Sequence, residues 1–134
     1  MATVRVEFDI EADAESVWKV ISDWASAPVR MAPGFVTESV EAENGDRVVT
    51  FASGAVARER FIALDEDRRR VVFSVVGEAL KPTHDNASMQ ILPREAGGCT
   101  FVWIHDVLPD AFGEPMLATM QAATPVIQQA LRTR

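Results

Sequence analysis

The N-terminal segment, residues 3–10 (TVRVEFDI), alternates between apolar positions and polar or charged ones. Successive side chains of a strand point to opposite faces, so the apolar members would share one face: Val4, Val6, Phe8 and Ile10. This pattern is typical of a half-buried β-strand. We predict a first strand whose apolar face packs on the core.

A short helix is expected directly after this strand. Asp13 can cap it, because a carboxylate accepts hydrogen bonds from the free backbone N–H groups of a first turn. The helix would end near Asp23, and its buried stripe consists of Val17, Trp18, Val20 and Ile21.

A second short helical turn is expected from Trp24 toward Met31. Pro28 suits the beginning of such a turn, because its fixed φ is already helical and its missing N–H is not needed there. Pro33-Gly34 then returns the chain to extended structure.

Clusters of turn residues divide the chain from Phe35 to Leu108 into strand-length segments. The turn signals are Asn44-Gly45, Ser53-Gly54, Asp65-Glu66-Asp67, a looser break around Lys81-Pro82, and Gly97-Gly98. The predicted strands cover residues 35–42, 47–52, 55–64, 69–77, 84–93 and 98–108. Such regular spacing indicates an antiparallel meander in which each strand pairs with the next.

One long amphipathic helix is predicted at the C-terminus, beginning at Pro115. Its apolar stripe follows helical spacing and consists of Met116, Met120, Ala123, Ile127 and Leu131. Pro125 removes the hydrogen bond to the carbonyl of Gln121, so we expect a kink there.

Length and charge limit the classes of function. With 134 residues the chain fits one domain, 1–134, and its net charge of -7 repels nucleic acid and anionic lipid. No apolar stretch reaches the ~20 residues that span a bilayer, and the N-terminus lacks a signal-peptide core. We therefore expect a soluble cytoplasmic protein without nucleic-acid partners or a membrane span.

The last predicted strand carries the most chemically informative face. Phe101, Trp103 and His105 alternate onto the same side. If Gly97-Gly98 lies in the turn of the preceding hairpin, residue 90 lies opposite 103 and residue 88 opposite 105. The polar side chains expected to join this face are Asn86, Ser88 and Gln90.

The opposite face of the same hairpin competes for the interior. It carries the more apolar set Met89, Ile91, Val102 and Ile104, and binary patterning alone would place that set in the core. A slip of one residue in register exchanges the two faces. We predict that the polar and aromatic face lies inside, which leaves the apolar stripe as a candidate homodimer contact.

His105 is the candidate general acid or base, since burial can move an imidazole across neutral pH. The alternative is a hydrogen-bonded structural histidine. Ser88, across the hairpin, is the candidate nucleophile, but no third group that would orient the imidazole is evident.

No metal, cofactor or disulfide is expected. The dipeptides His84-Asp85 and His105-Asp106 point their members to opposite faces of a strand and lack the i, i+4 spacing of a zinc helix. Cys99 has no partner in the sequence, and we expect a buried thiol rather than a nucleophile.

The order of elements, together with two segments, resembles a known superfamily. The opening VRVEFDIEADAESVWKVISDW is similar to its first strand and "VW" helix, and GGCTFVWIHDVLP to its final hairpin. The chain resembles the helix-grip fold, shared by START-related lipid carriers and pathogenesis-related plant allergens. Within that superfamily it is most similar to the polyketide cyclase/dehydrase and lipid-transport group.

The resemblance implies an α+β fold in which a seven-stranded antiparallel sheet curls around the long C-terminal helix, with two short helices after strand 1. The sheet and helix would enclose a cavity into which Trp103 points. Arg58 could bind an enolate or carboxylate there, as arginines are thought to do in cyclases, unless it lies on a solvated edge.

Two function classes follow from this container. The chain binds a small hydrophobic or aromatic molecule, either as a cyclase- or dehydratase-like enzyme using His105 and Ser88, or as a carrier or sensor for a lipid, sterol or aromatic metabolite. An interaction module acting through the apolar stripe is a third, less favoured class. The expected ligand-binding residues are Trp103, Phe101, Gln90, Asn86, Arg58, Trp24, Met31, Phe73 and Met120.

Overall fold

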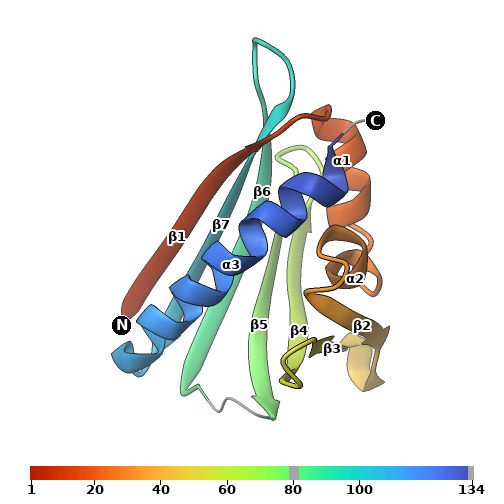
Figure 1. The fold of residues 1–134 in the computed structure, drawn as a ribbon. Helices are drawn as coiled ribbons and strands as arrows, with labels where there is room; N and C mark the ends of the chain where they lie inside the picture. Colours follow the sequence, from red (N-terminus) through yellow and green to blue (C-terminus); the bar gives the residue numbers. More distant parts are fainter. Residues whose placement is uncertain (79–81, 133–134) are drawn as a thin grey trace.

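A computed structural model of the chain describes residues 1–78 and 82–132. Figure 1 shows a sheet of long strands with a long helix lying across one face and shorter helices beside it. The strands are β1 (Ala2–Ile10), β2 (Val36–Glu41), β3 (Arg47–Phe51), β4 (Val56–Asp65), β5 (Arg70–Glu78), β6 (His84–Pro93) and β7 (Cys99–Leu108). The helices are α1 (Ala14–Ile21), α2 (Ala27–Met31) and α3 (Gly113–Leu131), with short 3₁₀ turns at Glu43–Gly45 and Asp110–Phe112.

The sheet has the strand order β1-β7-β6-β5-β4-β3-β2. Each strand from β2 to β7 pairs with the next along the chain, and β1 closes against β7. The predicted fold is confirmed, including the meander and the two short helices. Of the predicted break at Lys81-Pro82, Lys81 lies outside the described residues.

Local signals explain the helix boundaries. The Asp13 carboxylate accepts from the backbone N–H of Ser16 at 2.9 Å and so caps α1, as predicted. Pro28 lies in the first turn of α2. The helix α3 begins at Gly113, two residues before the predicted Pro115, and continues through Pro125. The kink at Pro125 stays a prediction.

The core lies between α3, α1 and one face of the sheet. Met120, Ala123 and Ile127 of α3 are buried there, and Met116 and Leu131 pack beside them, which confirms the predicted stripe. In the sheet, the Phe8 and Phe101 rings stack with centroids 4.8 Å apart. No helix within residues 1–78 and 82–132 is long and apolar enough to cross a bilayer.

The predicted register of the last hairpin is wrong by one residue. Trp103 lies opposite Met89, and His105 lies opposite Ala87. The reason is the turn. Arg94 N–H donates to the Gly98 carbonyl at 3.1 Å, and Gly97 N–H to the Arg94 carbonyl, so the hairpin closes with a three-residue loop, 95–97. Gly97 and Gly98 both have positive φ, as expected for a type I turn followed by a bulge.

The corrected register removes the competition between the two faces. Met89 and Ile91 of β6 share the inner face with Phe101, Trp103 and His105. The inner face is therefore both apolar and aromatic. Only Val102 and Ile104 of the predicted homodimer stripe lie on the outer face, and Val102 is itself buried.

Candidate functional site

A small cavity lies between α3, α2 and the inner face of the sheet. Its volume is about 60 Å³. Sites for drug-sized molecules enclose ~300–1,000 Å³, so the volume of this cavity is large enough for only a few water molecules. Its lining is mostly apolar and consists of Pro28, Met31, Ala32, Phe35, Val36, Arg47, Val49, Phe51, Glu59, Phe73, Met89, Trp103, His105, Ala123 and Ile127.

His105 lies in this lining and forms a buried pair with Asp85. Oδ1 of Asp85 is 2.7 Å from Nδ1 of His105, and both side chains are almost fully buried. A carboxylate only accepts hydrogen bonds, so Nδ1 carries the proton and Nε2 is the nitrogen left for another partner. Asp85 is thus the group that orients the His105 imidazole, and it was not predicted from the sequence.

Trp103 is the second polar group of the lining. Its ring centroid is 6.0 Å from that of His105 and 6.3 Å from that of Phe101. The indole Nε1 is buried and has no hydrogen-bond partner among the described residues. Leaving a buried donor unpaired costs about 1–3 kcal/mol, so such groups are rare in native proteins.

A buried ion pair forms a third feature. Nε of Arg47 donates to Glu59 Oε1 at 2.8 Å, from the neighbouring strand, and Nη1 donates to the Trp24 carbonyl at 2.9 Å. The Arg47 guanidinium also lies over the Trp24 ring, 3.8 Å from its centroid, and near the Phe73 ring. Burial lowers the pKa of Arg47 from its ordinary value, although Glu59 opposes this shift.

Half-buried aromatic rings mark the side of the cavity nearest solvent. Phe35 and Phe51 meet edge to face with centroids 5.9 Å apart, and both are only partly buried. Met31 and Pro28 of α2 complete this wall. These side chains are the ones that would have to move for a larger molecule to enter.

The structure brings together some of the predicted site residues. His105, Trp103, Met31 and Phe73 line the cavity, and Trp24 contacts it through Arg47. Phe101 and Met120 are buried in the core outside the lining.

The remaining predicted residues lie elsewhere. Asn86, Ser88 and Gln90 are on the outer face of β6, because the register differs by one residue from the predicted one. Ser88 therefore faces away from His105. Arg58 donates to the buried carboxylate of Asp46 at 2.8 Å rather than to the cavity.

Three charged residues in or beside the cavity were not predicted from the sequence as site candidates: Asp85, Arg47 and Glu59. Asp85 shares strand parity with Ala87, Met89 and Ile91, so a correct register would have placed it on the inner face. Arg47 shares parity with Val49 and Phe51 in the same way. Because charged residues in a strand usually face solvent, the sequence pattern predicted exposed positions for them.

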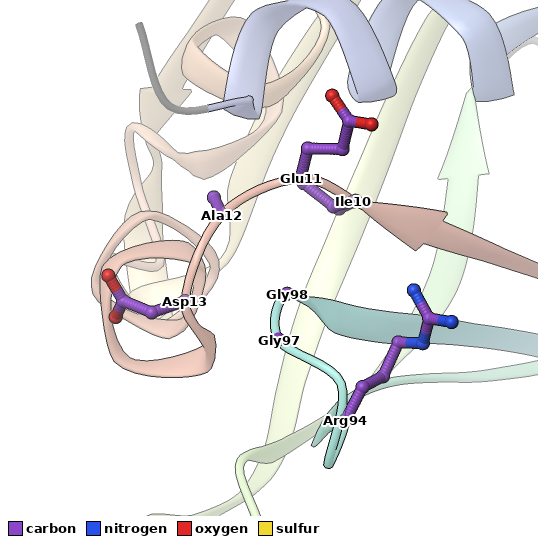
Figure 2. Close-up of a pocket in the computed structure, with 7 residues that line it drawn as sticks. All are labelled: Ile10, Glu11, Ala12, Asp13, Arg94, Gly97 and Gly98. Carbon is purple, nitrogen blue, oxygen red and sulfur yellow. The ribbon is translucent and has the colours of Figure 1, made fainter.

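A second, larger hollow of about 440 Å³ lies on the surface where β1 meets α1. Figure 2 shows its lining, with Glu11 extending toward α3 and Arg94 coming from the β6–β7 hairpin. Its charged side chains, Glu11, Asp13 and Arg94, are exposed. Asp13 already caps α1, and Arg94 lies 3.5 Å from Asp9. The cavity lined by Trp103 and His105, with its mostly apolar lining, is therefore the better candidate for a small-molecule site.

Solved structures with the same fold support this placement of helix and sheet. The protein XoxI from Bacillus cereus has a TM-score of 0.84 at 17% identity, covering 98% of this chain and 96% of that one. A START superfamily protein from Mycobacterium smegmatis has a TM-score of 0.74 at 14% identity, covering 96% of each chain.

An enzyme of the same fold is also similar. Norcoclaurine synthase from Thalictrum flavum, solved in complex with dopamine and hydroxybenzaldehyde, has a TM-score of 0.69 at 19% identity, covering 96% of this chain and 84% of that one.

No curated protein matches the sequence. The model of the polyketide cyclase / dehydrase and lipid transport family matches residues 1–133, and the chain therefore belongs to that family.

Proposed function

We propose that this protein binds a small, largely apolar molecule that carries a hydrogen-bond acceptor, in the cavity lined by Trp103 and His105. The unpaired Nε1 of Trp103 carries the proposal. A bound oxygen atom would give this buried donor the partner that it lacks, and the apolar lining would favour the rest of the molecule through burial.

The ligand has to widen the cavity. A volume of about 60 Å³ is smaller than one aromatic ring with its substituents, so the side chains on the solvent side would move apart on binding. Met31 is unbranched and adaptable, and Phe35 and Phe51 are only half-buried, which makes this wall the easiest to displace. Binding then selects an open form of the protein.

Proton transfer at His105 is the chemistry that the pair with Asp85 favours. In a dehydration, Nε2 would take a proton from the carbon beside a carbonyl, while the carbonyl oxygen, becoming an enolate, accepts from Trp103 Nε1. The hydroxyl on the next carbon would leave and take the proton from the imidazolium as water. Asp85 would hold Nδ1–H throughout.

A carrier without catalysis is the second candidate. Apart from Arg47, Glu59, Trp103 and His105, every lining side chain is apolar, as suits a lipid or aromatic metabolite that is held and released unchanged. In that case the His105–Asp85 pair has only a structural role, as a buried hydrogen bond between β6 and β7.

Native mass spectrometry of freshly purified protein tests the binding proposal. We expect a co-purifying small molecule in the wild type and its loss in Ala123→Leu, whose larger side chain would fill the cavity. Ala122→Leu is the matched control, because Ala122 is the exposed neighbour on the same helix. Equal retention of the molecule in both variants would place its binding elsewhere and overturn the proposal.

The same molecule then separates the enzyme from the carrier. Incubation with wild-type protein and with His105→Gln, followed by mass spectrometry of the small-molecule fraction, would show a product only with the wild type if His105 transfers a proton. Unchanged molecule in both samples, with equal binding, favours the carrier.

A further inference from the structure

We infer that the cavity selects an uncharged molecule with a hydroxyl group and discriminates against carboxylates. This inference rests on the proposed binding function and adds the chemical class of the ligand. It follows from the partners that three of the four polar lining side chains already have, Arg47, Glu59 and His105, and from the free donor of the fourth, Trp103.

The positive charge of Arg47 is not available to an anion. Glu59 neutralises it at 2.8 Å, and both residues are buried. The guanidinium is also held between the Trp24 carbonyl and the Trp24 and Phe73 rings. A ligand carboxylate would have to displace Glu59 from Arg47, and the two negative charges would repel each other away from water.

Asp85 adds to this exclusion of anions. Its carboxylate lies behind His105, with Oδ1 at 2.7 Å from Nδ1, and is almost fully buried. When His105 is neutral, this pair carries one uncompensated negative charge. Glu59 in the lining and Asp85 behind it are then two carboxylates against the one guanidinium of Arg47, which disfavours a further carboxylate in the cavity.

A hydroxyl matches the remaining hydrogen-bonding groups. Trp103 Nε1 can only donate, and neutral His105, with Nδ1–H on Asp85, can only accept at Nε2. The two ring centroids are 6.0 Å apart. One hydroxyl can accept from Trp103 and donate to His105, whereas an ether or a carbonyl satisfies only the first, and a hydrocarbon satisfies neither.

Four probes of similar size test this selection: phenol, anisole, toluene and benzoate. Each is titrated into the full-length protein at pH 7 and constant ionic strength, with binding followed by NMR. We expect phenol to bind at least ten-fold more tightly than benzoate and several-fold more tightly than toluene, with anisole between phenol and toluene.

Two variants assign the selection to particular residues. Trp103→Phe should reduce the phenol-to-toluene ratio toward one, and Trp18→Phe should leave that ratio unchanged, because Trp18 donates to Glu66 outside the cavity. Glu59→Gln should free Arg47 and raise benzoate affinity at least ten-fold relative to phenol.

The possible outcomes distinguish a failure of the selectivity inference from a failure of the proposed binding function. If none of the four probes binds the wild type, the proposed binding function fails and the inference fails with it. If they bind but benzoate is as tight as phenol, or toluene equals phenol, the cavity binds ligands and the inference alone is overturned.

Discussion

Asp85 and His105 lie diagonally across neighbouring antiparallel strands, with 2.7 Å between the Asp85 Oδ1 and the His105 Nδ1. Their direct partners in the ladder are Val107 and Ala87, so the pair spans one step of the inner face. The contact fixes the tautomer of a histidine in the cavity lining, whatever the function of the protein.

Replacing Asp85 by Asn should remove the preference of His105 for the tautomer with the proton on Nδ1. We expect wild-type His105 to give ¹⁵N NMR shifts of a protonated Nδ1, and Asp85→Asn to give a mixture or the opposite tautomer. The lost charge-assisted bond should lower the free energy of unfolding by about 1–3 kcal/mol in urea titrations.

Asp106→Asn is the control for this change. Asp106 is adjacent to His105 in sequence, but it lies on the outer face and accepts from Thr3. It should leave the His105 shifts unchanged. The same tautomer in all three proteins would show that Asp85 does not orient the ring.

Ile127→Ala should both destabilise the protein and enlarge the cavity. Ile127 is fully buried and lies in the lining, so truncation should lower the free energy of unfolding by about 2–5 kcal/mol. Toluene, which fits the added apolar space, should then bind more tightly than to the wild type. Ile62→Ala, at a side chain 50% exposed, should cost less than about 1 kcal/mol and leave toluene binding unchanged.

Gly98 should tolerate alanine less well than Gly45, although both have a φ of +77°. A Cβ on Gly98 would lie 2.8 Å from the backbone oxygen of Ile10, whereas nothing lies within 4 Å of one on Gly45. Both substitutions strain the backbone by about 1 kcal/mol, and the clash should add at least about 1 kcal/mol at Gly98. Equal losses in urea unfolding would show that the β1–β7 end relaxes freely.

Asp46 should make the free energy of unfolding decrease at acid pH. Hydrogen bonds from Arg60 and Arg58 lower the pKa of this buried carboxyl below its ordinary 3.8, against the opposing effect of burial. A lowered folded pKa means that the stabilisation is fully present above the unfolded pKa and is lost as the pH falls through the folded value.

Urea titrations at several pH values check this dependence. Asp46→Asn should be less stable than the wild type by about 1–3 kcal/mol at pH 7, and the difference should shrink below about pH 4. Asp67→Asn, at an exposed position, should give parallel pH profiles with the wild type. A wild-type advantage that persists undiminished at the lowest pH would contradict the role of Asp46.

The order and type of the elements could be predicted from the sequence because local signals agree with the fold. The alternation of residues 3–10, the Asp13 cap and the α3 stripe each depend on neighbours in the chain. The inner position of Trp103 and His105 also followed from alternation, together with the family resemblance.

The polar partners of the site could not be predicted in the same way. Whether Asp85 or Asn86 lies beside His105 depends on one residue in the loop 95–97, and the sequence Ala96-Gly97-Gly98 is compatible with turns of two or three residues. The Arg47–Glu59 pair depends on cross-strand register as well. Arg47 and Glu59 are not neighbours in the sequence and pair only in the folded sheet, so the sequence alone predicts two solvent-exposed charges.

The three indoles occupy three different environments, which gives the molecule a built-in optical reporter. Trp18 donates to Glu66, Trp24 to the Gly45 carbonyl, and Trp103 belongs to the cavity wall. Since the chain contains no tyrosine, its near-ultraviolet emission comes almost wholly from these rings. With phenylalanine at positions 18 and 24, fluorescence would arise from one indole, and quenching by an added compound would report occupancy without any label.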